Sequence, residues 1–119
     1  VLDAVYTKAK EKMTEFNQMK RYKNELFSLI SNILVLQLEK NDLEKSLFYY
    51  ADLEKTVSAS DNKMYEHTML LFFKELIAIM QQEDAQKLTD IIRTFKLLDM
   101  ERVANQCEGL LETVRNNNA

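Results

Sequence analysis

Residues that interrupt regular structure are almost missing from this 119-residue sequence, which has no proline and a single glycine. Because both residues break helices, their scarcity favours long helices joined by short polar turns. Asn-Gly and Asp-Gly hairpin turns are also absent, as is sustained alternation of apolar and polar residues, so nothing indicates β-strands. We therefore expect one all-α domain.

Residues that usually carry chemistry are equally scarce. The sequence has one cysteine, Cys107, and one histidine, His67. A lone cysteine excludes an internal disulfide and a cysteine-based metal site. A nucleophilic pair would require these two distant residues to meet, and nothing in the sequence favours that. There is no glycine-rich phosphate loop either. We expect no enzymatic activity, no metal and no cofactor.

The charge balance is mildly acidic. The net charge is −3, with 16 Lys and Arg against 19 Asp and Glu. This balance gives no support for nucleic-acid binding by this chain. No apolar run reaches the roughly 20 residues that span a bilayer. We expect a cytoplasmic protein with no membrane partner, and the single cysteine fits a reducing compartment.

What the sequence does contain is a pattern that recurs after about 42 residues. Residues 39–45 (EKNDLEK) match residues 81–87 (QQEDAQK), and in both copies a long apolar run precedes the aspartate and a shorter amphipathic run follows it. A repeat of this length is typical of stacked helical hairpins, because each pair needs a neighbour to bury its apolar face. The predicted fold is a tetratricopeptide-like α-solenoid of antiparallel hairpins.

The spacing of apolar residues predicts about six helices. They cover about residues 2–17, 19–40, 43–57, 62–82, 85–98 and 100–115. We group them as the second helix of a truncated repeat (1–17), two full repeats (19–57 and 61–98) and a terminal helix (99–116). Asp42, Asp84 and Asp99 each stand where an N-cap belongs. Gly109 falls inside the last helix, where it costs about 1 kcal/mol relative to alanine unless close packing needs the missing side chain.

Polar residues interrupt two of the apolar helices. The strip on the second predicted helix consists of Asn24, Ser28, Ser31 and Asn32, and the strip on the fourth consists of Lys63, His67, Lys74 and Ala78. The simplest interpretation is that these strips meet solvent. Alternatively a groove is lined by Asn24, Ser28, Asn32, His67 and Lys74. A 42-residue step matches Asn32 to Lys74 and would place both on one side of the stack. An Asn amide offers donors and an acceptor together, which suits pairing with a peptide backbone.

The last predicted helix carries more apolar surface than one neighbouring helix requires. Its apolar residues are Val103, Cys107, Leu110, Leu111 and Val114. Because a terminal repeat needs a polar cap or a partner, we expect a homodimer through the last two helices.

Four segments resemble a known family: Tyr22–Asn32, Leu70–Ile77, Ile92–Leu98 and Val103–Asn105. Over roughly residues 15–115 the sequence is similar to the C-terminal regulatory domain of the Rgg/MutR/GadR transcriptional regulators of Gram-positive bacteria. That family has a Tyr or Trp, then Glu-Leu, then an aromatic residue and an Asn along one long helix. It usually has Gly near the loop before its last helix, where this chain has Asp99.

The resemblance implies a tetratricopeptide-like domain that binds a short peptide pheromone on its concave face, as in quorum sensing. It also implies a homodimer formed by the C-terminal helices. Asn32 is the residue that the resemblance implies as a ligand contact. DNA would be bound only through an N-terminal helix-turn-helix, which is absent from this sequence together with the upstream repeats. The alternative function is a helical-repeat scaffold that docks a partner protein.

Overall fold

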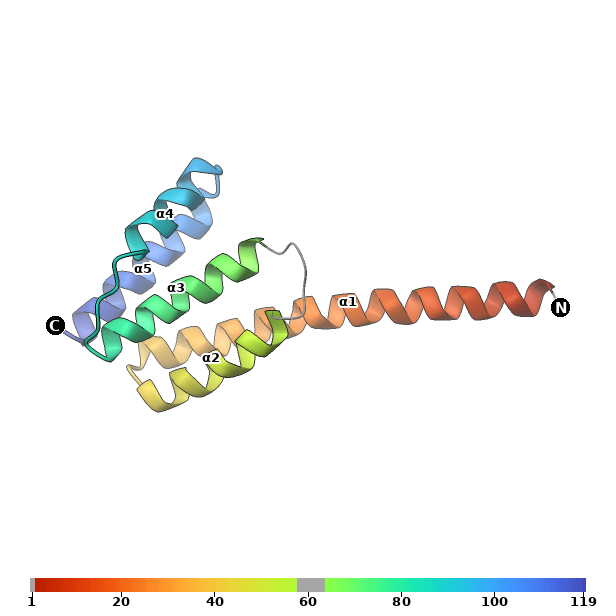
Figure 1. Ribbon diagram of the computed structural model, residues 1–119, viewed down its shortest axis with the longest axis horizontal. Helices are drawn as coiled ribbons and strands as arrows, with labels where there is room; N and C mark the ends of the chain where they lie inside the picture. Colours follow the sequence, from red (N-terminus) through yellow and green to blue (C-terminus); the bar gives the residue numbers. More distant parts are fainter. Residues whose placement is uncertain (1, 58–63) are drawn as a thin grey trace.

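The computed structural model describes the backbone of residues 2–57 and 64–119, and within the first helix it describes the side chains of residues 4, 6–11 and 24–39. Its five helices are α1 (Leu2–Glu39), α2 (Leu43–Val57), α3 (Met64–Met80), α4 (Leu88–Leu97) and α5 (Glu101–Asn117) (Figure 1). The described residues contain no strand. The predicted all-α fold of helical hairpins is confirmed.

The first two predicted helices form one continuous helix, so the predicted break near residue 18 is wrong. The helix continues because residues 17–19 (NQM) contain neither proline nor glycine to end it. The N-terminal half of α1 extends away from the other four helices (Figure 1). It gives the molecule its long dimension of 69 Å.

The core lies around the C-terminal half of α1 and the four helices that follow it. α2 packs against α1 on one side and α3 on the other, while α5 contacts α4, α3 and α1. α3 is the most deeply buried helix, as its apolar circumference predicts. The apolar side chains with the least exposure are Leu34, Leu38, Leu53, Val57, Phe72, Phe73, Leu76, Leu88, Ala104 and Val114.

Three helices end in the same way. Asn41, Gln82 and Asp99 adopt positive φ angles of 59°, 60° and 58°. At each end two backbone N–H groups donate to carbonyls of the last turn, as Gln82 does to Ile79 (3.0 Å) and Glu83 to Ala78 (2.8 Å). This is the Schellman arrangement, which usually has glycine at the left-handed position. With one glycine in the chain, other residues fill that position.

Of the three predicted N-caps, the structure has one. Asp42 caps α2, because its Oδ1 accepts the backbone N–H of Lys45 at 3.0 Å. The other two predictions are wrong. α4 begins at Leu88 after Lys87, too late for Asp84, and α5 begins at Glu101 after Met100; neither start has a side-chain cap. Asp99 is instead the left-handed residue that terminates α4. The predicted start of the fourth helix near residue 62 lies outside the described residues.

The C-terminus ties α5 back to the end of α1. Asn117 Nδ2 donates to the backbone carbonyl of Glu39 at 3.0 Å. Asn118 Nδ2 donates to Asn41 Oδ1 at 3.0 Å and to the Val114 carbonyl at 2.8 Å. These bonds fix the spacing between α1 and α5 at the end where both helices finish.

Candidate functional site: a groove between α1, α3 and α5

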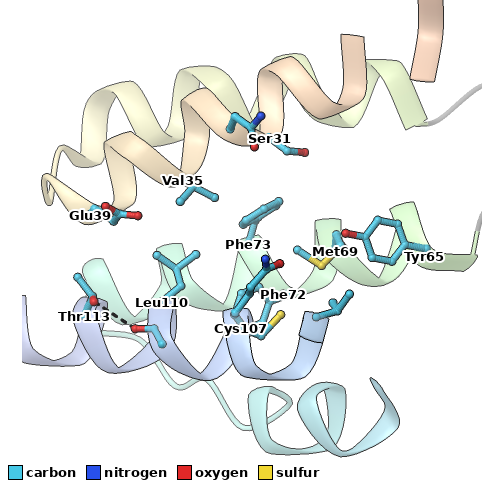
Figure 2. A pocket seen from close by; sticks show the side chains of 14 residues that line it. Ser31, Val35, Glu39, Tyr65, Met69, Phe72, Phe73, Cys107, Leu110 and Thr113 are labelled. Atoms are coloured by element: carbon cyan, nitrogen blue, oxygen red, sulfur yellow. Dashed lines mark hydrogen bonds between the residues drawn. The ribbon is translucent and has the colours of Figure 1, made fainter. Parts of the chain in front are cut away.

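A groove of about 530 Å³ lies where α1, α3 and α5 converge (Figure 2). This volume falls within the range typical of ligand sites. α1 and α5 form its walls and α3 lies between them. Its lining residues are Ser31, Asn32, Val35 and Glu39 of α1, Tyr65, Met69, Phe72 and Phe73 of α3, and Val103, Gln106, Cys107, Gly109, Leu110 and Thr113 of α5.

The base of the groove is apolar and deeply buried. Phe72 and Phe73 have almost no solvent exposure, at 0% and 1%. Their rings lie 6.0 Å apart and are tilted against each other. Half-buried Val35, Met69 and Leu110 continue this surface toward the opening. A ligand would therefore meet the apolar surface of Val35, Met69 and Leu110, with the two buried rings packed behind it, and burying that surface would be favourable.

Polar groups stand along both walls. Asn32 on α1 and Gln106 on α5 are exposed amides, and each offers two donors and an acceptor. Ser31 Oγ is buried without a hydrogen-bond partner in the described part of the chain. Thr113 Oγ1 donates to the Gly109 carbonyl at 3.1 Å (Figure 2), so its lone pairs remain free as acceptors. Mixed donors and acceptors beside an apolar base suit a peptide main chain with apolar side chains.

The groove carries little charge. Glu39 is the one charged side chain among the described lining residues, and it lies at the opposite end from Tyr65 (Figure 2). Burial raises the pKa of the Tyr65 hydroxyl, with smaller contributions from Cys107 and Glu66, so this hydroxyl stays protonated and can donate. Burial, with Glu108 nearby, raises the pKa of the Cys107 thiol to about 11. At neutral pH that thiol is protonated and a poor nucleophile.

The comparisons with known proteins bear on this groove. The family model for the C-terminal domain of the HTH-type transcriptional regulator Rgg matches residues 1–109. The chain belongs to this family. Neither a curated protein nor a solved structure matches the sequence. This family consists of transcriptional-regulator domains and is not a family of enzymes. The matched residues include every lining residue of the groove except Leu110 and Thr113.

Of the residues predicted to bind a ligand, the Rgg domain places only Asn32 in this groove. Lys74 lies on another side of α3, in a cleft of about 390 Å³ toward α2. This cleft is lined by Leu47, Tyr50, Lys74, Glu75, Ile77, Ala78, Gln81, Glu83 and Asp84. Asn24, Ser28 and His67 are exposed and line neither hollow.

The separation of Asn32 from Lys74 follows from the true repeat length. The left-handed residues that end α1 and α3 are Asn41 and Gln82, a step of 41 residues and not 42. One residue turns a helix by about 100°, so the shift matters. With the corrected step Asn32 corresponds to Phe73, and these two residues do line the same groove.

The residues predicted for a dimer contact are mostly inside the domain. Cys107, Leu111 and Val114 are buried in its core, at 2%, 8% and 0% exposure. Val103 and Leu110 are half-buried and face the groove. The prediction assumed one neighbour for the last helix, but α5 contacts α4, α3 and α1, which accounts for its apolar surface.

Most lining residues were not predicted as site residues, among them Glu39, Tyr65, Gln106 and Gly109. Glu39 and Gln106 are ordinary exposed polar residues in the sequence, and nothing marks them. Gly109 did give a signal, because a glycine inside a helix needs a reason.

Two kinds of site have no support among the described residues. They contain no group of three or more His, Cys, Asp or Glu side chains that could hold a metal. None of their helices combines the length and the apolar character needed to cross a membrane.

Proposed function

We propose that this chain is the ligand-sensing and dimerising part of its regulator, and that a short peptide binds in the groove between α1, α3 and α5. The observation that carries this proposal is the pairing of an apolar base with amides on both walls. An extended peptide needs both features, since its main chain requires donors and acceptors while its apolar side chains require burial. Membership of the Rgg family supports a regulatory role.

The dimensions and the charge of the groove limit the length and the charge of a peptide that could bind there. From Ser31 to Glu39 the wall formed by α1 rises about 12 Å, because a helix rises 1.5 Å per residue. An extended peptide covers roughly 3.3 Å per residue, so about four residues fit along this wall. Among the described residues, the lining contains one carboxylate and no basic side chain. Charge complementarity therefore favours an apolar peptide that is neutral or cationic.

The dimer contact that we propose uses the exposed end of α4. Leu97 and Leu98 are 78% and 53% exposed, although both are large apolar side chains. Lys96 pairs with Glu108 at 2.6 Å and holds this end of α4 against α5. The proposed dimer contact thus moves from the buried residues of α5 to Leu97 and Leu98 at the end of α4.

The mechanism is a population shift. A peptide that fits the groove better in one spacing of α1 and α5 favours that spacing by its difference in affinity. In a cytoplasmic regulator this change would reach a DNA-binding helix-turn-helix attached to the domain.

The direct test is peptide binding by the 119-residue chain. The probe is a pool of synthetic hexapeptides of Leu, Ile, Val, Phe and Gly, labelled at the C-terminus and read by fluorescence anisotropy. We expect saturable binding that weakens about tenfold in Asn32→Ala, because an amide removed from a buried hydrogen bond costs ~1–3 kcal/mol. An absence of binding to the unaltered protein would contradict the proposal.

The dimer has its own test in light scattering across a range of concentrations. We expect a concentration-dependent dimer that Leu97→Glu disrupts, while Leu47→Glu, a change at an exposed leucine of α2, leaves it intact. A strict monomer at high concentration would rule out the dimer.

A further inference from the structure

Gly109 is the single glycine of the chain, and it lies in the middle of α5. Glycine is unfavourable in a helix interior, because it loses more backbone freedom on folding than any other residue. A glycine there therefore requires either an unusual backbone conformation or a close contact that leaves no room for a side chain.

Among the residues that the structure describes, neither requirement is met. Gly109 does not have a positive φ angle. A Cβ atom built onto it would meet no other atom within 4 Å. Alanine would fit at this position without displacing any neighbour in the structure.

The space beside Gly109 is the groove. Gln106 lies about one turn before it on α5 and Thr113 about one turn after it, and both line the same groove. Leu110, the next residue, adds half-buried apolar surface. Gly109 is thus a gap in the wall formed by α5, bounded by an amide on one side and a hydroxyl on the other.

We infer that Gly109 is a ligand-contact position, where an apolar side chain of the bound peptide packs against the backbone of α5. This inference rests on the proposed peptide-binding function and identifies the position that limits the size of the peptide residue there. The absence of a side chain at Gly109 then leaves space for a side chain of the peptide. The Gln106 amide and the Thr113 hydroxyl, on either side of the gap, are placed to bond the adjoining peptide main chain.

Stability and binding should respond in opposite directions if this is correct. Gly109→Ala should raise the melting temperature by about 4 °C, because alanine is the better helix former. It should nevertheless weaken binding of the hexapeptide pool about threefold, and Gly109→Leu should weaken it about tenfold or more, because inserted atoms overpack an occupied site. A purely structural glycine would lose stability on the same substitutions.

The matched control is Asn105, an exposed residue of α5 that does not line the groove. Asn105→Ala and Asn105→Leu should leave the affinity for the pool unchanged. A second readout needs no variant: as the only glycine, Gly109 gives one easily recognised amide signal in a ¹H–¹⁵N spectrum. We expect this signal to shift in proportion to the fraction of the protein bound.

The outcomes separate this inference from the function on which it rests. If the pool binds, Asn32→Ala weakens it, and neither the Gly109 signal nor the Gly109 variants respond, then the inference is wrong and peptide binding stands. If the pool does not bind the unaltered protein, both are wrong. A lower melting temperature for Gly109→Ala would show that the glycine serves the fold, and would also overturn the inference.

Discussion

The two hollows on either side of α3 differ in what they offer a ligand. The groove toward α1 and α5 has two aromatic rings at its base, amides on both walls and one carboxylate. The cleft toward α2 is smaller and is bordered by four charged side chains: Lys74, Glu75, Glu83 and Asp84. Charged groups at an open rim are well solvated and gain little from pairing. This difference supports the proposal that an apolar ligand binds in the groove and not in the cleft.

The largest expected effect concerns stability, and it compares one lining residue of each hollow. Phe72 lies at the base of the groove with no exposure, so Phe72→Ala should lower the free energy of unfolding by about 3–5 kcal/mol. Leu47 in the cleft is 41% exposed, so Leu47→Ala should cost less than about 1 kcal/mol. Urea denaturation followed by circular dichroism measures both. Equal losses of unfolding free energy would mean that Leu47 contributes as much to the core as Phe72 does.

Binding should distinguish the walls of the two hollows. Asn32→Ala should weaken the affinity for the hexapeptide pool about tenfold, which is ~1.4 kcal/mol. Lys74→Ala and His67→Ala should leave it unchanged, because neither residue lines the groove. Isothermal titration calorimetry on the three variants makes the comparison. An equal loss of affinity in Lys74→Ala and Asn32→Ala would favour the 42-residue alignment and would mean that the peptide does not bind in the groove alone.

The helix ends beside the two hollows should respond differently to glycine. Gln82 precedes the cleft residues Glu83 and Asp84 and has a φ of 60°, a conformation costly for a residue with a Cβ. Gln82→Gly should therefore raise the free energy of unfolding by about 1 kcal/mol. Asn41→Gly should bring no gain, because Asn tolerates this conformation and its Oδ1 accepts a bond from Asn118. Denaturation midpoints of the two variants provide the measurement.

A further expected effect is a loss of stability at alkaline pH. Burial raises the folded-state pKa of Cys107, in the groove, to about 11, whereas an unfolded thiol ionises near pH 8.5. Between these values the unfolded state releases a proton that the folded state keeps, so stability falls as the pH rises. Burial also raises the pKa of Tyr50, in the cleft, helped by Glu54, so it acts in the same direction.

Melting temperatures between pH 8 and pH 11 should show this decline, and Cys107→Ala should make it shallower without abolishing it. A decline of the same steepness in Cys107→Ala would mean that the thiol does not contribute.

The sequence predicted the fold better than the site, for a physical reason. The class of the fold and the range of α2 followed from apolar periodicity, which survives an error of one residue in the repeat length. The site did not survive it, because one residue rotates a helix by about 100° and moves Lys74 out of the groove. The repeat length of 41 residues is set by the left-handed backbone conformation of Asn41 and Gln82. The identity of these two residues does not predict that conformation. Gly109 was visible in the sequence, but only the empty space beside it gives it a role.

The most direct test of the central claim is to see which hollow responds when peptide is added. Methyl groups report on both: Val35, Met69 and Leu110 line the groove, and Leu47 and Ile77 line the cleft. The measurement is a methyl NMR titration of the ¹³C-labelled protein with the hexapeptide pool. The account predicts saturating shifts for Val35, Met69 and Leu110, with Leu47 and Ile77 unchanged. Shifts at Leu47 and Ile77 with a silent groove would contradict it.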